Sequence, residues 1–143
     1  MITKNGPIIL IDDDIDDLEI TSQIITELGV KNEIVCFSSC TDALEHLQSD
    51  KRIDQPFVIL SDVNLPKMNG VELKKRIDQN DALRKKSIPF IFLSTAYSQA
   101  ILNEVYELRV QGYFIKGTTI NELKETLEMI FRYWTICKHP NSL

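Results

Sequence analysis

The sequence is poor in the features that mark secreted and membrane-spanning proteins. It has three cysteines, Cys36, Cys40 and Cys137, and no Cys-x-x-Cys pair. An odd number without such a pair indicates reduced thiols in a cytoplasmic protein rather than a disulfide framework. No apolar run approaches the length needed to span a bilayer, and the first seven residues lack a signal-peptide pattern. We therefore expect a cytoplasmic location and no membrane insertion.

Basic residues are also in the minority. Lys and Arg number 16 against 21 Asp and Glu, which gives a formal net charge of −5 at pH 7. Two short basic clusters, at residues 74–76 and 84–86, are interpreted as solvated charge on helices and loops. A nucleic-acid-binding surface needs more clustered positive charge, so no nucleic-acid partner is expected.

Short apolar runs alternate along the chain with stretches of helical periodicity. The apolar runs predict five buried strands, at residues 8–11, 33–37, 57–60, 90–93 and 113–115. The periodic stretches predict five helices, at residues 16–28, 41–47, 71–77, 99–108 and 120–134. The charged stretch 79–87 is predicted to be a helix end followed by a loop.

Five strand–helix units predict an α/β fold with a doubly wound parallel sheet. Strands this continuously apolar need helices on both faces. Right-handed crossovers then favour the flavodoxin-like strand order 2-1-3-4-5. With 143 residues and 43% hydrophobic content, the chain fits one domain over residues 1–143, with a core at about 7–134 and a short C-terminal tail at 135–143.

Charged side chains follow the carboxyl ends of the predicted strands. Asp12 and Asp13 end the first strand, and Asp62 follows the third. The ends of these two strands flank the crevice where the strand order reverses. Three carboxylates that meet there repel one another unless a cation is bound. Their hard oxygen ligands predict Mg²⁺ or Mn²⁺.

Other groups near this edge suit phosphoryl transfer. The backbone carbonyl of Asn64 is placed to add one oxygen ligand to the cation. Lys116 follows the fifth strand and would act as a point charge on a phosphate. Ser94, at the end of the fourth strand, would bond another phosphoryl oxygen. One of the carboxylates can then attack a phosphoryl group whose oxygens the metal neutralises.

Three further acids, Asp14, Asp16 and Asp17, follow the paired acids directly. Acidic side chains in the first turn of a helix interact favourably with its dipole. We interpret these three as helix N-terminal acids without a part in the chemistry.

In this order, the residues resemble the receiver domain of two-component response regulators, the CheY-like family. The resemblance covers residues 8 to about 134. It includes the paired acids, the segment 60–70 with its Asp-x-x-Leu-Pro-x-Met-x-Gly pattern, Ser94, Tyr113 and Lys116. The aromatic end of the last helix and its short Pro-bearing tail resemble the stand-alone receivers that partner bacterial phytochrome-type kinases.

The resemblance implies that Asp62 takes a phosphoryl group from a phosphohistidine of a sensor histidine kinase or a histidine phosphotransfer protein. It implies that Mg²⁺ is bound by the side chains of Asp13 and Asp62 and by the Asn64 carbonyl, with Asp12 assisting through water. Such a protein assists its own phosphorylation and dephosphorylation, and we do not expect it to be an enzyme.

The resemblance also implies a switch. Ser94 moves toward the phosphoryl group, with Thr95 as a rival for that role, and Tyr113 swings inward. The surface of helix 99–108, strand 113–115 and helix 120–134 then changes its affinity for a downstream protein target. The sequence leaves two interpretations of Phe131 and Trp134 in the last helix: a cover for the core, or a homodimer or partner surface assisted by Val105 and Tyr106.

The chain departs from the family pattern after the lysine. Gly117 stands where the family usually has a proline, and the family commonly has a cis peptide bond there. Without proline, a cis bond costs about 3 kcal/mol. The sequence therefore leaves the conformation of this loop open.

Two other functions stay open from the sequence. A haloacid-dehalogenase-like phosphatase would use Asp12-x-Asp14 as its first motif. That family needs an acidic pair at another strand end after the lysine, and its mechanism gives Asp62 no role. A degenerate receiver would instead dock to a partner without being phosphorylated, and Gly117 is the one feature in its favour.

Overall fold

The computed structural model describes residues 6–49 and 57–138. Within them, five parallel strands form one sheet in the order β2-β1-β3-β4-β5. The strands are β1 (Ile8–Ile11), β2 (Ile34–Phe37), β3 (Val58–Ser61), β4 (Phe90–Ser94) and β5 (Gly112–Ile115). This order confirms the predicted flavodoxin-like fold.

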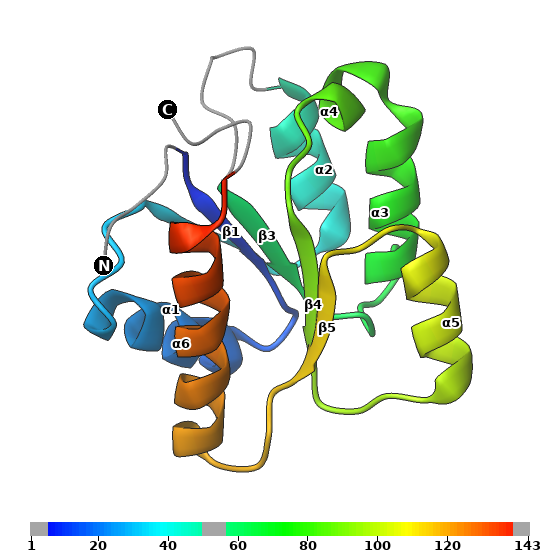
Figure 1. Cartoon of the computed structure of the whole chain (residues 1–143). Coiled ribbons are helices and arrows are strands. Elements are labelled where there is room, and N and C mark those ends of the chain that lie inside the picture. Colours follow the sequence, from blue (N-terminus) through cyan, green and yellow to red (C-terminus); the bar gives the residue numbers. More distant parts are fainter. Residues whose placement is uncertain (1–5, 50–56, 139–143) are drawn as a thin grey trace.

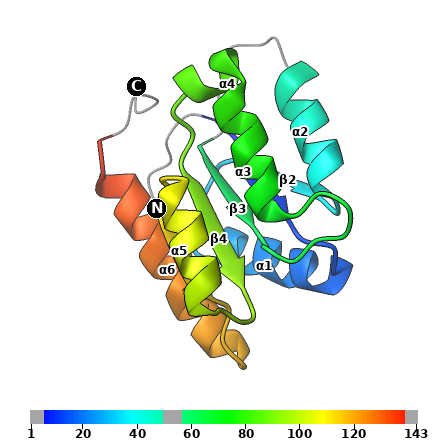
Figure 2. The same ribbon diagram turned by 90° about the vertical axis from the view of Figure 1, so that its right-hand side faces the viewer.

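Helices cover both faces of the sheet. They are α1 (Ile15–Glu27), α2 (Cys40–Ser49), α3 (Gly70–Gln79), α4 (Asp81–Lys85), α5 (Gln99–Glu107) and α6 (Ile120–Ile136). Figure 1 shows α1 and α6 on one face, and α2, α3 and α5 on the other; Figure 2 gives the perpendicular view. The predicted strands and helices match within two residues at each end.

The structure corrects the prediction at one helix. The stretch 79–87, predicted to be a helix end followed by a loop, contains the separate helix α4, so the described chain has six helices instead of five. Asn80 begins this helix, because its side chain accepts a hydrogen bond from the backbone N–H of Leu83 at 3.0 Å. Within this helix, the side chain of Leu83 is buried. A single turn with one buried side chain has no periodicity to read, and therefore the sequence pattern missed it.

The alternation of side chains along the strands divides the core into two layers. Ile8 and Leu10 of β1 pack with α1 and α6, and Ile9 and Ile11 pack with α2, α3 and α5. Successive strand side chains point to opposite faces, so an apolar run of four residues supplies both layers. The sheet is thereby fixed between two sets of helices, with its carboxyl edge left open at the loops.

The last helix is longer than predicted and ends at Ile136 instead of residue 134. Residues 139–143 of the predicted tail lie outside the described residues. None of the described helices combines the length and the apolar character required to cross a membrane.

Candidate functional site

Backbone hydrogen bonds continue past the strand ends and fix where the functional side chains begin. The N–H of Asp62 donates to the carbonyl of Ile11 at 2.9 Å, which joins the end of β3 to the end of β1. The N–H of Lys116 donates to the carbonyl of Ser94 at 2.8 Å, which joins β5 to β4. The two residues therefore leave the same edge of the sheet.

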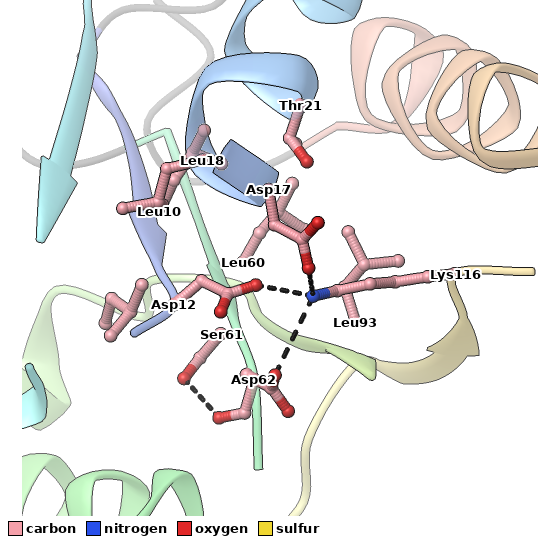
Figure 3. Close-up of a pocket in the computed structure, with 11 residues that line it drawn as sticks. Leu10, Asp12, Asp17, Leu18, Thr21, Leu60, Ser61, Asp62, Leu93 and Lys116 are labelled. Carbon is pink, nitrogen blue, oxygen red and sulfur yellow. Dashed lines mark hydrogen bonds and ion pairs between the residues drawn. The ribbon is translucent and has the colours of Figure 1, made fainter. Parts of the chain in front are cut away.

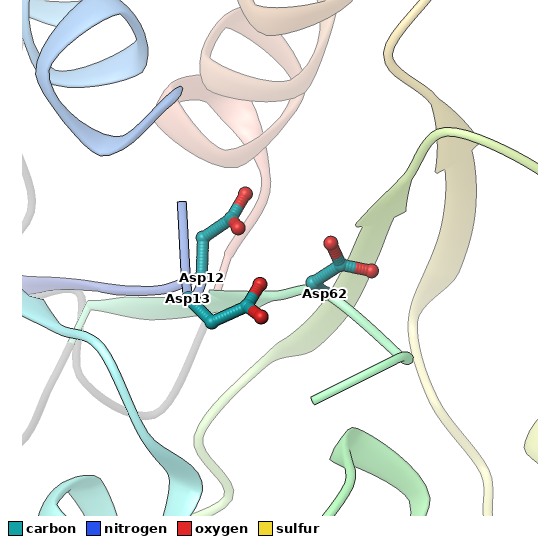
Figure 4. Close-up of side chains that lie close together, drawn as sticks. All are labelled: Asp12, Asp13 and Asp62. Carbon is teal, nitrogen blue, oxygen red and sulfur yellow. The ribbon is translucent and has the colours of Figure 1, made fainter. Parts of the chain in front are cut away.

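Three carboxylates meet at this edge, as the sequence predicted. One oxygen from each of Asp12, Asp13 and Asp62 lies within 4.8 Å of the others, and we call these residues the acid cluster. Figure 4 shows their carboxylates close together at the ends of β1 and β3. Asp12 is buried, Asp62 is half-buried and Asp13 is exposed. Hard oxygen donors at this spacing fit a divalent cation such as Mg²⁺ or Mn²⁺.

Lys116 lies against the acid cluster and is only 8% exposed. Its Nζ is 2.5 Å from Asp12 Oδ2 and 3.7 Å from Asp62 Oδ2. A third carboxylate, Asp17 Oδ2 on α1, is 3.2 Å away. Figure 3 shows all three side chains pointing at the ammonium group.

The environment of Lys116 raises its pKa above the usual value for lysine. Burial alone would lower the pKa, because it penalises the charged form. The hydrogen bond and the charge of Asp12 act against burial, and the charge of Asp62 and the hydrogen bond to Asp17 act in the same direction. Lys116 is therefore a fixed positive charge beside Asp62.

A hydroxyl and a backbone amide hold one oxygen of Asp62. Its Oδ1 accepts hydrogen bonds from the hydroxyl of Ser94 at 3.0 Å and from the N–H of Asn64 at 3.3 Å. Ser94 is fully buried, whereas its rival Thr95 is exposed. The structure therefore brings Ser94 to the carboxylate. It also places Asn64, the predicted carbonyl ligand, directly beside Asp62.

Tyr113 lies away from the carboxylates. Its hydroxyl donates to the carbonyl of Ala96 at 2.6 Å, and its ring packs against Phe92 with the centroids 5.9 Å apart. The side chain is half-buried on the face of the sheet that α5 covers. It is thus tied to the loop that follows Ser94, between β4 and α5.

The structure places Asp14, Asp16 and Asp17 at the start of α1, as predicted, but adds one contact at the pocket. Asp14 begins α1, since its side chain accepts from the N–H of Asp16 and of Asp17. Asp17 also bonds Lys116, which the sequence analysis missed. A signal was present, because Asp17 lies four residues before the buried Thr21 and therefore on the inward side of the helix.

The loop after Lys116 has a conformation that suits glycine. No peptide bond among the described residues is cis, so the Lys116–Gly117 bond is trans. Gly117 has φ = 81°, in the left-handed region. The carboxylate of Glu122 lies against it and accepts a hydrogen bond from the N–H of Thr118 at 2.8 Å. Glu122 thus holds the loop at the start of α6.

The acids that a haloacid-dehalogenase-like phosphatase would need are used elsewhere. Asp14, the second acid of its first motif, caps α1. Glu122, after the lysine, is bonded to the loop before α6. Within the described residues, neither joins the acid cluster.

The acid cluster lies at the carboxyl edge of a flavodoxin-like sheet, beside a buried lysine, and the hydroxyl of Ser94 donates a hydrogen bond to Asp62. This combination of fold and site defines a receiver domain. The family model of the response regulator receiver domain matches residues 8–128. The chain therefore belongs to the response regulator receiver family.

Individual relatives and solved structures agree with this assignment. The response regulator Rcp1 of Synechocystis is 27% identical over 130 residues, which cover 89% of this chain and 87% of that protein. The chemotaxis protein CheY-3 of Vibrio cholerae is 30% identical over 131 residues, covering 92% and 95%. The phosphorylated cyanobacterial phytochrome response regulator RcpA superposes with a TM-score of 0.85 at 25% identity, over 95% of this chain and 99% of that chain.

Receiver domains share a metal-binding pocket and the same classes of protein partner. Receiver domains bind Mg²⁺ or Mn²⁺ at this acidic pocket, and Rcp1 has been solved in a Mn²⁺-bound form. That structure superposes with a TM-score of 0.81 at 26% identity, over 94% of this chain and 97% of that chain. Receiver domains interact with histidine kinases or phosphotransfer proteins, and with downstream targets.

Proposed function

We propose that Asp62 is the phosphoacceptor of a two-component signalling pathway. The observation that carries this proposal is the set of contacts around its carboxylate. Oδ1 accepts from Ser94 and Asn64, Oδ2 faces Lys116, and two further acids lie beside it. The family membership of the chain supports the same assignment.

In the proposed reaction, a carboxylate oxygen of Asp62 attacks the phosphorus of a phosphohistidine. The new O–P bond forms as the P–N bond breaks, and the phosphoryl group leaves the imidazole of the donor. Lys116 provides a fixed positive charge for the oxygens of the group that is transferred. The reaction leaves an aspartyl phosphate, whose two negative charges change the electrostatics of the pocket.

We further propose Mg²⁺ as the ion of this site, with Mn²⁺ able to replace it. When bound, the ion would neutralise developing charge on the phosphoryl oxygens. Asp13 and Asp62 would provide carboxylate ligands, Asn64 a carbonyl ligand, and Asp12 a contact through water. Asp12 Oδ2 already accepts a hydrogen bond from Lys116, and Asp12 Oδ1 accepts one from the N–H of Asp14. These two bonds support a contact of Asp12 with the ion through water.

The proposed switch uses Ser94 and Tyr113. A phosphoryl oxygen would accept the hydrogen bond that Ser94 now donates to Asp62 at 3.0 Å. Movement of Ser94 would displace the following loop, whose Ala96 carbonyl holds the Tyr113 hydroxyl. The helix–strand–helix surface of α5, β5 and α6 would then change its affinity for a downstream target.

We propose a signalling role in the cytoplasm for this chain. The phosphoryl donor would be a sensor histidine kinase or a histidine phosphotransfer protein, and the chain would work in the cytoplasm. It would act as a signalling switch and not as an enzyme that turns over a substrate. A homodimer through the surface of α5, β5 and α6 stays a prediction. A degenerate receiver that docks without being phosphorylated is the alternative to this proposal.

The test is intact-mass spectrometry after incubation with acetyl phosphate and Mg²⁺. We expect the wild type to gain one phosphoryl group only when Mg²⁺ is present. Asp62→Asn should gain none. Asp14→Asn is the matched control, because it removes one neighbouring charge and keeps a good helix-capping side chain, and it should be phosphorylated like the wild type. Equal phosphorylation of Asp62→Asn would contradict the proposal.

A further inference from the structure

The ammonium group of Lys116 has more acidic partners than one positive charge can neutralise. Three carboxylates, those of Asp12, Asp17 and Asp62, surround it within 4.0 Å. Two of its three N–H groups donate hydrogen bonds, to Asp12 and to Asp17. Asp62 is the most distant of the three, at 3.7 Å, and receives no hydrogen bond from it. In this state Lys116 is therefore held more closely by α1 and β1 than by the phosphoacceptor.

Asp17 differs from the other two partners in its place and its contacts. It lies on the first turn of α1, not at a strand end, and its side chain is 39% exposed. It is not part of the acid cluster in the described structure. Its side-chain contact at the pocket is with Lys116 (Figure 3). The charge of Asp17 therefore acts on the pocket through the lysine.

We propose that Asp17 is a positioning residue, which holds the Lys116 ammonium group on the α1 side of the pocket and competes for it with a phosphoryl group on Asp62. This inference rests on the proposed function. Phosphorylation replaces the single negative charge of the Asp62 carboxylate with the two charges of an aspartyl phosphate, so the lysine faces one more negative charge. Asp17 reduces the positive charge that the phosphoryl group meets, because it shares the ammonium group of Lys116. Asp17 thus favours the unphosphorylated state.

The direction of the effect follows from the same contacts. Replacing Asp17 by asparagine leaves Lys116 with Asp12 as a close partner, so the lysine stays in the pocket. One competing charge is removed, and the lysine becomes more available to an anion on Asp62. Partly exposed ion pairs are worth up to about 1 kcal/mol, which corresponds to a change in affinity of up to about fivefold.

The experiment measures the affinity for beryllofluoride, an analogue of the phosphoryl group, by isothermal titration calorimetry at saturating Mg²⁺. Asp16→Asn is the matched control, since it removes an exposed acid from the same helical turn, and the Asp16 side chain makes no hydrogen bond or ion pair with Lys116 or Asp62 in the described structure. We expect Asp17→Asn to bind beryllofluoride more tightly than Asp16→Asn, by up to about fivefold. Asp17→Glu, whose carboxylate can still reach the lysine, should restore the wild-type affinity.

Two further measurements separate the alternatives. The thermal stability of Asp17→Asn should fall only slightly below that of Asp16→Asn, because both lose one acid from the first turn of α1 and Asp17→Asn also loses a partly exposed ion pair with Lys116. A purely structural role for Asp17 would lower stability without tightening binding. Equal or weaker beryllofluoride binding by Asp17→Asn, relative to the control, overturns the positioning role alone. Failure of the wild type to bind beryllofluoride with Mg²⁺ overturns the proposed function and this inference together.

Discussion

Replacing Gly117 by alanine tests how the loop after Lys116 is held. Gly117 has φ = 81°, a conformation that costs a residue with a Cβ about 1–2 kcal/mol. An added Cβ would overlap the Oε2 of Glu122 and would lie 2.7 Å from its Cβ. The carboxylate of Glu122 therefore has to move away, and the N–H of Thr118 loses its acceptor.

The two costs set the expected size of the effect. An exposed hydrogen bond of this kind contributes about 0.5–1 kcal/mol. Together with the backbone strain, Gly117→Ala should lower the free energy of unfolding by about 1.5–3 kcal/mol. The assay is urea denaturation at equilibrium, followed by far-UV circular dichroism, with Gly117→Ala, Glu122→Ala and the double variant.

The double variant separates the backbone strain at residue 117 from the contact with the Glu122 side chain. In the Glu122→Ala background the hydrogen bond is already lost and the overlap with the carboxylate is removed. Gly117→Ala should then cost about 1 kcal/mol less than in the wild type. An equal cost in both backgrounds would refute the role assigned to Glu122. No cost in either background would refute the left-handed conformation of Gly117.

Three more changes have defined outcomes. Gly70→Ala adds a Cβ that overlaps the backbone carbonyl of Asp62; it should lower the free energy of unfolding by about 1–3 kcal/mol and weaken Mg²⁺ binding measured by calorimetry. Tyr113→Phe removes a 2.6 Å hydrogen bond to the loop before α5 and should cost about 0.5–1.5 kcal/mol in urea denaturation. Burial raises the pKa of the Cys40 thiol to about 12 from 9.0, so under native conditions a thiol reagent should label the exposed Cys36 first. For the same reason, the contribution of Cys40 to stability should be complete below pH 9 and decline as the pH rises toward 12, in urea melts compared with Cys40→Ser.

The sheet and the acid cluster were predictable because each depends on a strong local signal. Continuous apolar runs mark buried parallel strands, and the strand order then follows from a small set of topologies. Asp12, Asp13 and Asp62 come directly after such runs. Parallel strands end at one edge, so their convergence follows from the fold and needs no detail of side-chain packing.

Other features depend on contacts that sequence spacing does not specify. The helix α4 is one turn long and is held by the cap from Asn80, so periodicity gave no sign of it. The bond between Asp17 and Lys116 joins residues 99 positions apart. At Gly117, the trans bond and the left-handed conformation place the loop against Glu122 of the next helix. The first and third features depend on particular local side-chain contacts, and the second depends on tertiary packing that brings distant groups together.

Chemical trapping of the phosphorylated residue tests the central claim most directly. Borohydride reduces an acyl phosphate to an alcohol and leaves free carboxylates intact, so the reduced residue can be located by peptide mass spectrometry. After treatment with acetyl phosphate and Mg²⁺, we predict reduction at Asp62 alone. Reduction at Asp12 would point to a phosphatase that uses the first strand for its nucleophile. Reduction at no aspartate would contradict the assignment of Asp62 as a phosphoacceptor.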